Sequence, residues 1–258
     1  MRMASLGSGS GGNALVVEAG GTRVLLDCGF GIRDTVARLA RLGLDPEHLM
    51  GILVTHEHDD HVGGAFKFAA KFGVRLWMTH GTLRSAGRHV PGRLDHAQIE
   101  IIDSHTRFDI GELEIHPFPV PHDAGEPVQF TFTDGNHKLG VLTDTGTSTP
   151  HIESMLHDCH ALALECNHDL EMLMNGVYAR SLKLRISGRY GHLDNTSAAS
   201  LLARLKHDKL QHILALHLSE NNNTAALAAT ALSGALGCTS DWIGIASQES
   251  GFDWRQLS

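Results

Sequence analysis

The sequence is poor in cysteine, and its few cysteines form no recognisable pair. Four are scattered over 258 residues without a Cys-x-x-Cys motif: Cys28, Cys159, Cys166 and Cys238. Disulfide frameworks are typical of short, cysteine-dense chains, and most cysteine-based zinc or redox sites contain closely spaced pairs. We therefore expect small, buried, unpaired thiols, a reducing compartment and a cytoplasmic location.

Long apolar runs are also missing. No stretch approaches the ~20 apolar residues that a membrane-spanning helix needs. Residues 1–6 lack the apolar region of a secretory signal peptide. These absences predict a protein without a membrane partner, and they leave its oligomeric state open.

Positive charge is scarce. The chain has 21 Lys and Arg against 29 Asp and Glu, which gives a formal net charge of -8. The overall field of such a protein does not attract nucleic acid, so any contact with it must be local. The chain is long enough for a sizeable core, and no linker or low-complexity stretch divides it. We expect a single domain over residues 1–258.

Histidine and aspartate are concentrated in residues 55–61, Thr-His-Glu-His-Asp-Asp-His. The segment follows the short apolar run 51–54, which predicts a buried strand, and precedes residues 65–72, which fit a helix. Imidazole and carboxylate groups on a loop at a strand end are suited to Zn, Mn or Fe. One metal does not need all four groups, so the spacing suggests two metals near His56, His58, Asp60 and His61.

Three later segments each place one such side chain where an apolar run ends. They carry His122, Asp144 and His217. Asp27 also ends a predicted strand, where it could either be structural or form a hydrogen bond to a ligating histidine from behind.

The glycine-rich segment 7–12 matches G-x-G-x-x-G, a pattern that is weak by itself. A dinucleotide site needs a helix after the glycines, but residues 14–18 are strand-like. We therefore reject a dinucleotide site and predict a flexible connection whose backbone amides could face an anion.

The remaining pattern is α/β. Residues 99–142 alternate in short strands that predict a second, antiparallel sheet, and residues 80–97 give no assignment. The expected strands are 1–6, 14–18, 22–26, 51–54, 74–78, 99–102, 113–116, 128–132, 137–142, 161–164 and 213–216. The expected helices are 33–42, 65–72, 195–206 and 224–236.

Thr-His-x-His-x-Asp-His, followed by His, Asp and His at strand ends, resembles the metallo-β-lactamase-fold hydrolases over nearly the whole chain. The resemblance implies a four-layer αβ/βα sandwich with two divalent metal ions between its sheets. Zinc is the favoured metal, and manganese is the alternative. It implies His56, His58 and His122 on one metal, Asp60, His61 and His217 on the other, and Asp144 bridging both.

Two neighbouring residues are weaker candidates. His116 competes with His122 for the third position on the first metal, but it alternates within a strand and shares a face with Glu114. We favour His122 because it follows its strand. We do not expect Asp59 to be a ligand.

Further segments resemble the YycJ/WalJ-like bacterial branch, whose members are metal-dependent 5′→3′ exodeoxyribonucleases. These segments are 7–13, 121–124, 181–186, 191–195 and 217–222. Asp194 stands where that branch would have a serine, which puts local helix capping in doubt. The resemblance implies a phosphodiesterase with DNA as substrate, in which Asp60 also orients the attacking water or receives its proton.

The phosphate-facing groups are expected in the acid-free interval 172–193. A helix near 178–186 would present Arg180, Lys183 and Arg185 to backbone phosphates, with His192 beside the metals as a phosphate ligand or proton donor. The structural alternative is a solvated basic helix, which could also pack through Leu182, Leu184 and Ile186. Two functional alternatives also remain, a carbonyl hydrolase acting on a thioester, lactone or lactam, and a non-enzymatic metal-binding module.

Overall fold

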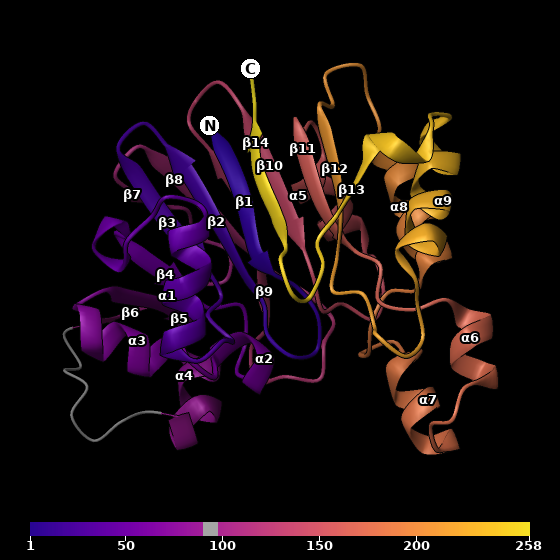
Figure 1. The fold of residues 1–258 in the computed structure, drawn as a ribbon, viewed down its shortest axis with the longest axis horizontal. Coiled ribbons are helices and arrows are strands. Elements are labelled where there is room, and N and C mark those ends of the chain that lie inside the picture. Colours follow the sequence, from indigo (N-terminus) through magenta and orange to yellow (C-terminus); the bar gives the residue numbers. More distant parts are fainter. Residues whose placement is uncertain (90–97) are drawn as a thin grey trace.

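The computed structural model describes residues 1–89 and 98–258. Two sheets stand face to face in the middle of the molecule, and helices cover their outer faces (Figure 1). This is the predicted four-layer αβ/βα arrangement.

The first sheet has the strand order β14-β1-β2-β3-β4-β5-β6. Its strands pair antiparallel from β14 to β3 and parallel from β3 to β6. The bounds are β14 (Phe252–Gln256), β1 (Arg2–Gly7), β2 (Ala14–Ala19), β3 (Thr22–Leu26), β4 (Gly51–Leu53), β5 (Arg75–Thr79) and β6 (Ile99–Ile102).

The second sheet has the strand order β13-β12-β11-β10-β9-β8-β7. It is antiparallel from β7 to β10 and parallel from β10 to β13. The bounds are β7 (Phe108–Ile110), β8 (Leu113–Pro119), β9 (Val128–Thr133), β10 (Lys138–Leu142), β11 (Ala161–Glu165), β12 (His212–Leu216) and β13 (Ile243–Ile245).

Three apolar clusters hold the layers together. One lies between the sheets and includes Leu53, Phe132 and Val141. A second joins the first sheet to α1 (Ile32–Arg41) and α3 (Ala65–Phe72), and a third joins the second sheet to helices α5 (Pro150–Leu156), α8 (Asn195–Leu205) and α9 (Ala225–Leu236). Strands covered on both faces explain the continuous apolar runs in the sequence.

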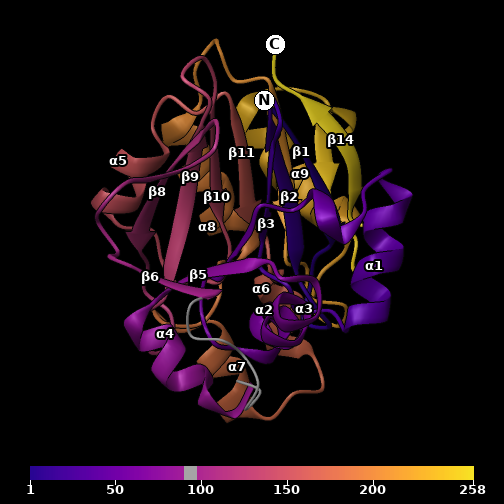
Figure 2. The same ribbon diagram turned by 90° about the vertical axis from the view of Figure 1, so that its left-hand side faces the viewer.

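Four short helices lie at the end of the sandwich opposite the two chain termini (Figure 2). They are α2 (Asp59–Val62), α4 (His80–Ser85), α6 (Leu170–Asn175) and α7 (Arg180–Ile186). The remaining short elements are the 3-10 turns η1 (Pro46–His48), η2 (Ala86–His89) and η4 (Ser240–Trp242).

The predicted elements are confirmed apart from their ends, with one error of placement. Residues 99–102 were expected in the second, antiparallel sheet, but β6 pairs parallel with β5 at the edge of the first sheet. Its polar alternation reflects that edge position, where Ile101 is 50% exposed. The unassigned interval begins with α4 and η2, and its residues 90–97 lie outside the described part.

The four cysteines are free, as expected. Burial raises the pKa of Cys28 and Cys159 to about 12 and also raises the pKa of Cys166, whereas Cys238 is exposed. Among the described residues, every helix is too short or too polar to cross a membrane.

Because the thiolate is the reactive form of cysteine, iodoacetamide should modify one thiol, Cys238, in the folded protein and all four after denaturation. The intact mass should not change on reduction when the protein is purified under alkylating conditions. A mass shift on reduction would show a disulfide and contradict the prediction of a reducing environment.

Candidate metal centre

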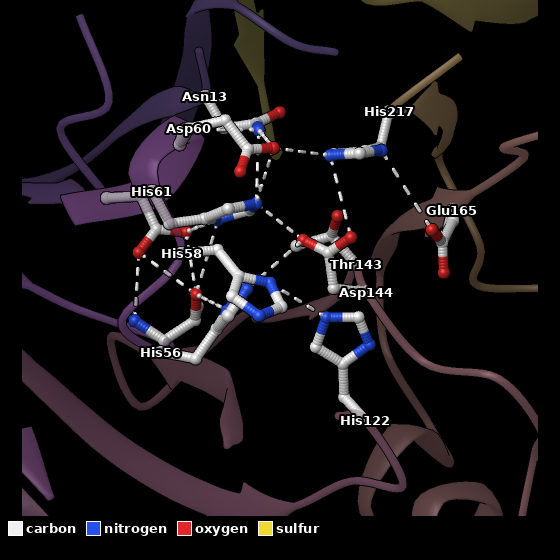
Figure 3. Close-up of polar contacts among 12 residues, drawn as sticks. Asn13, His56, His58, Asp60, His61, His122, Thr143, Asp144, Glu165 and His217 are labelled. Carbon is white, nitrogen blue, oxygen red and sulfur yellow. Dashed lines mark hydrogen bonds and ion pairs between the residues drawn. The ribbon is translucent and has the colours of Figure 1, made fainter. Parts of the chain in front are cut away.

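All seven expected ligands meet at the helix-bearing end of the sandwich, between the two sheets (Figure 3). They come from the loops that follow β4, β8, β10 and β12, and from the single turn of α2. Segments up to about 160 residues apart in the chain therefore supply one cluster, as the parallel strand order of each sheet predicts.

His56, His58 and His122 form the first group. Their ring centroids lie 4.5 to 5.0 Å apart, and one nitrogen of each lies within 4.8 Å of the others. The Nε2 atom of His122 is 3.3 Å from Nδ1 of His58. Three converging imidazoles offer one face of a tetrahedral metal site.

Asp60, His61 and His217 form the second group. The Oδ2 atom of Asp60 lies 3.1 Å from Nε2 of His217 and 3.4 Å from Nε2 of His61. Asp59, the first residue of α2, instead faces Nε2 of His89 at 2.8 Å. The side chain of Asp60 therefore points into the cluster, whereas that of Asp59 points to the surface. This geometry agrees with the expectation that Asp59 is not a ligand.

Asp144 stands between the two groups. Its Oδ2 atom is 4.0 Å from Nε2 of His56 and 2.5 Å from Nε2 of His61, while Oδ1 is 3.5 Å from Nε2 of His217. The side chain is 2% exposed, and neither oxygen makes a hydrogen bond within the described part of the chain. The Nε2 atom of His56 is likewise buried without a hydrogen bond.

His116 lies outside this cluster. It sits within β8, opposite Thr131 of β9, and is not among the described residues that could hold a metal. The cluster thus includes the third histidine that we favoured, His122.

The backbone turns sharply at several residues of the cluster and its surroundings that follow strands. Asp27, Asp144 and His217 all have positive φ, at 61°, 47° and 54°, a conformation that is uncommon outside glycine. Gly29 allows the loop after β3 to approach α2, because a Cβ there would lie 1.9 Å from the Asp60 carbonyl oxygen. Such local strain is typical of functional sites.

A second layer of hydrogen bonds orients the ligands. Asp27 accepts a hydrogen bond from the Thr55 amide and lies 2.7 Å from Nδ1 of His61. Thr55 Oγ1 is 2.9 Å from Nδ1 of His56, and Nδ1 of His122 donates to the Gly191 carbonyl oxygen. These contacts direct Nε2 of each histidine into the cluster, which is the usual role of partners behind a metal ligand. Asp27 thus contacts one of the expected ligands from behind, as one of its two expected roles requires.

The glycine-rich loop differs from the prediction. The amides of Ser8, Gly9, Gly11, Gly12 and Asn13 all donate hydrogen bonds within the protein, so these amides do not face an anion. The loop instead supports the cluster: Asn13 Nδ2 lies 3.3 Å from Asp60 Oδ2, and Ser8 Oγ accepts from the His217 amide. The loop is therefore an ordered support for the cluster rather than a flexible connection, and its Ser8 and Asn13 side chains make the supporting contacts.

The electrostatics of the cluster favour a cation among its carboxylates. Burial lowers the pKa of His56 and His122, which therefore remain neutral. Burial would raise the pKa of Asp60 and Asp144, but the neighbouring histidines hold both well below the usual range. Burial would also lower the pKa of His61, but the carboxylates of Asp144, Asp60 and Asp27 raise it well above normal. The same negative field favours a divalent cation.

These observations test whether the residues fit metal ions. The donor set consists of imidazoles and carboxylates, and Asp144 lies between the two groups. Nε2 of His56 and both carboxylate oxygens of Asp144 are buried without a hydrogen-bond partner among the described residues. Buried polar atoms rarely remain unpaired unless another group satisfies them. The cluster therefore fits divalent metal ions.

His192 lies beside the cluster, as expected, and is held by a residue that the sequence did not reveal. Its Nδ1 atom is 2.7 Å from Oε1 of Glu165, the last residue of β11, and 3.0 Å from Oδ1 of Asp144. The fully buried Glu165 also accepts hydrogen bonds from the amides of Thr145 and Leu193. Burial would lower the pKa of His192, but Glu165 and Asp144 raise it well above the usual value.

A cavity of about 220 Å³ opens onto the cluster. It is lined by Ser10, His58, Asp60, Asp123, Asp144, Leu182, Arg185, Ile186, Gly191, His192 and His217. Of the three expected cations, Arg185 lies in this wall, where its Nε donates to Oδ2 of Asp123 at 2.7 Å. Lys183 donates to the Met174 carbonyl oxygen, and Arg180 is exposed at the start of α7.

The doubt about Asp194 is resolved by the geometry of α8. Asp194 is the N-cap residue, and its Oδ1 accepts hydrogen bonds from the amides of Thr196 and Ser197. Aspartate caps a helix about as well as serine does, so the departure from the expected residue leaves the helix intact.

Comparison with known proteins agrees with this geometry. Residues 22–217 match the family model of the β-lactamase superfamily domain. The chain is 36% identical to exodeoxyribonuclease YycJ of Bacillus anthracis over 228 residues, covering 88% of this chain and 86% of the relative. It is 33% identical to exodeoxyribonuclease WalJ of Streptococcus pneumoniae over 224 residues, covering 86% and 83%.

Solved structures with low sequence identity share the fold. Zn²⁺-bound PqqB from Methylobacterium extorquens superposes with a TM-score of 0.76 at 17% identity, covering both chains completely. The metallo-β-lactamase fold protein YhfI from Bacillus subtilis superposes with a TM-score of 0.74 at 16% identity, covering 98% of each chain. Together with the family match and the two relatives, these likenesses show that the chain belongs to the β-lactamase superfamily and, within it, to the YycJ/WalJ-like proteins.

Proposed function

We propose that this protein is a metal-dependent phosphodiesterase, specifically a 5′→3′ exodeoxyribonuclease. The observation that carries the proposal is the cavity in which Arg185, from an acid-free segment, and His192 share a wall with the ligand cluster. The names of the two curated relatives support DNA as the substrate class. We further propose that residues 1–258 form one domain and that the protein is cytoplasmic.

The metal site proposed is binuclear. His56, His58 and His122 would hold one ion, Asp60, His61 and His217 the other, and Asp144 both. Zinc suits this set of imidazoles and carboxylates best, and manganese is the second candidate. When bound, two such ions lower the pKa of a water molecule and stabilise negative charge on the phosphate.

The chain's own residues would then position the substrate and move its protons. Asp60, held by Asn13 and His217, would orient the attacking water or receive its proton. His192 would bind the scissile phosphate or protonate the leaving oxygen through Nε2, because Glu165 occupies its Nδ1 atom.

Removing the cations of α7 should weaken DNA binding. We expect the double variant Lys183→Ala, Arg185→Ala to bind DNA less tightly. The slope of its salt dependence should fall by about one for each phosphate that the variant no longer binds. Fluorescence anisotropy at several salt concentrations measures both. The Arg180→Ala variant tests the third cation separately, since Arg180 lies outside the cavity wall.

The matched control is Lys206→Ala with Lys209→Ala, which removes the same charge before β12, at the end of that strand opposite His217. The control should bind DNA like the parent. If the α7 variant also binds and cleaves like the parent at every salt concentration, the basic segment is structural and a carbonyl hydrolase becomes the better assignment.

A substrate panel tests the proposed function directly. It comprises 5′-phosphorylated DNA, RNA, a chromogenic phosphodiester, a thioester and a cephalosporin. We expect DNA to be hydrolysed fastest, with mononucleotides released from the 5′ end. Preference for the thioester or the cephalosporin would identify a carbonyl hydrolase, and failure on every substrate by metal-loaded protein would favour a metal-binding module.

A further inference from the structure

Exposed apolar side chains are concentrated in residues 170–190, a segment that reaches the cavity at Leu182. Ten large apolar residues of the described chain are exposed, and six of them lie between residues 170 and 190. They are Leu170, Met174, Val177, Leu182, Leu184 and Tyr190. We call this group the apolar rim. Single exposed apolar residues are normal, but a group confined to one short segment marks an interaction site.

The rim is not used for packing within the chain. No residue of α7 is buried, and Leu184 is 57% exposed, so α7 does not bury its leucines in the core, although a solvated helix remains the structural alternative. Polar contacts hold α7 instead, from Lys183 to the Met174 carbonyl oxygen and from Arg185 to Asp123. Its apolar side chains therefore remain available to a partner.

The same segment is basic. Residues 172–193 contain no Asp or Glu, although the whole chain has a net charge of -8. Arg180 and Arg189 are exposed within it, next to the apolar rim in the sequence. The surface thus combines apolar area with local positive charge.

This surface continues into the cavity. Leu182, Arg185 and Ile186 line the cavity wall, and the Tyr190 carbonyl oxygen accepts a hydrogen bond from the amide of Asp123, which follows the expected ligand His122. Helix α7 lies at the same end of the sandwich as α2 (Figure 2). A polymer that enters the cavity would therefore pass over α7.

The charge and position of the apolar rim distinguish between the partners that could bind there. A second copy of the chain, docked by a two-fold axis, would bring the same cations against each other. Duplex DNA presents phosphates but keeps its bases stacked inside, which would leave the apolar side chains in water. A single strand presents both phosphates and free base faces, and proteins that bind such strands combine cations with base-stacking side chains.

We propose that the apolar rim binds the unstacked bases of a single-stranded DNA segment next to the scissile phosphate. The proposal rests on the proposed nuclease function. Tyr190 and Leu184 would contact the bases while Arg180 and Lys183 contact the backbone. The enzyme would then prefer a substrate whose strand is already separated near the cleavage point.

The experiment compares two phosphorothioate-linked single strands of equal length, one with normal bases and one abasic throughout. Metal-loaded protein should bind the normal strand more tightly. Leu184→Ser and Tyr190→Ala should each lower affinity about five- to tenfold for the normal strand only. Their salt dependence should equal that of the parent, because every phosphate-binding cation is still present. Met50→Ser and Trp242→Ala are the matched controls, since both side chains are exposed and each precedes a strand of a different sheet, β4 or β13.

Equal affinity of the parent for both strands would overturn the proposal, as would rim variants that bind the normal strand like the controls. A dimer in sedimentation that Leu184→Ser dissociates would overturn it in favour of a second copy. These results differ from failure of the proposed function, which would appear as absence of DNA cleavage by the parent. DNA cleavage with unaffected rim variants would reject the rim alone.

Discussion

The Asp144→Ala variant should lose most of its bound metal and at least about a hundredfold in activity. Loss of a hydrogen-bond partner behind a metal ligand already costs 10- to 100-fold, and Asp144 faces both ligand groups directly. Its carboxylate also places negative charge between two sites for cations, which would otherwise repel each other across a buried space. Both metal positions should therefore weaken together.

The measurement is metal content per folded chain by elemental mass spectrometry, together with DNA hydrolysis. His58→Ala should also lower metal content and activity, because His58 belongs to the first group. His116→Ala is the matched control, since this histidine lies on β8 and outside the cluster. The control should retain both metals and parental activity.

Two results would contradict the binuclear site. One is a fully active parent with one metal ion or fewer per chain. The other is an Asp144→Ala variant that is folded by circular dichroism and keeps both its metal and its activity. If His116→Ala rather than His58→Ala loses metal, the assignment of the first group is wrong.

The positions of the proposed ligands could be predicted from the sequence because each depends on a short local pattern. A short β-branched run predicts a strand, and the first polar residue beyond it is placed at the sheet edge. His122 and His217 are examples: each follows a strand whose apolar character is evident, and the structure brings both to the cluster. Once the strand order of each sheet is known, it places these strand ends close together.

Residues whose role depends on burial by distant parts of the chain could not be predicted in this way. Glu165 ends an apolar strand and gives no sign that it is fully buried, because its three partners come from loops at residues 145, 192 and 193. The same reason explains the error with residues 99–102. A short alternating strand fits either sheet, and only its partner, β5, decides between them.

The exposure of α7 could be predicted only in part. Leu182 and Leu184 lie about 200° apart around a helix, so they cannot share one buried face, but the sequence does not show whether either one packs against a neighbouring element. The structure leaves both exposed, so neither is part of the core, and the rim variants test whether they form a binding surface.

His192→Ala should reduce turnover of DNA by about 10²- to 10⁴-fold while leaving metal content unchanged, the range expected for loss of a positioned proton donor. His192 is fixed by Glu165 from behind and lines the cavity in front. The proposed set of seven ligands does not include it, although His192 lies within reach of Asp144 and His217. The variant therefore separates loss of catalysis from loss of metal, which Asp144→Ala does not.

The identity of the leaving group distinguishes the two roles open to His192. A proton donor matters most for the alkoxide that leaves from DNA and little for a nitrophenolate, which leaves without a proton. If His192 protonates the leaving oxygen, His192→Ala should lose far less activity on a nitrophenyl phosphodiester than on DNA. If it binds the scissile phosphate instead, both substrates should suffer alike. Glu165→Gln should show the same pattern with a smaller loss, because it keeps the shape of the side chain but weakens its hold on Nδ1. If a folded, metal-loaded His192→Ala variant turns over DNA like the parent, His192 takes no part in the reaction. A water molecule would then be the proton donor.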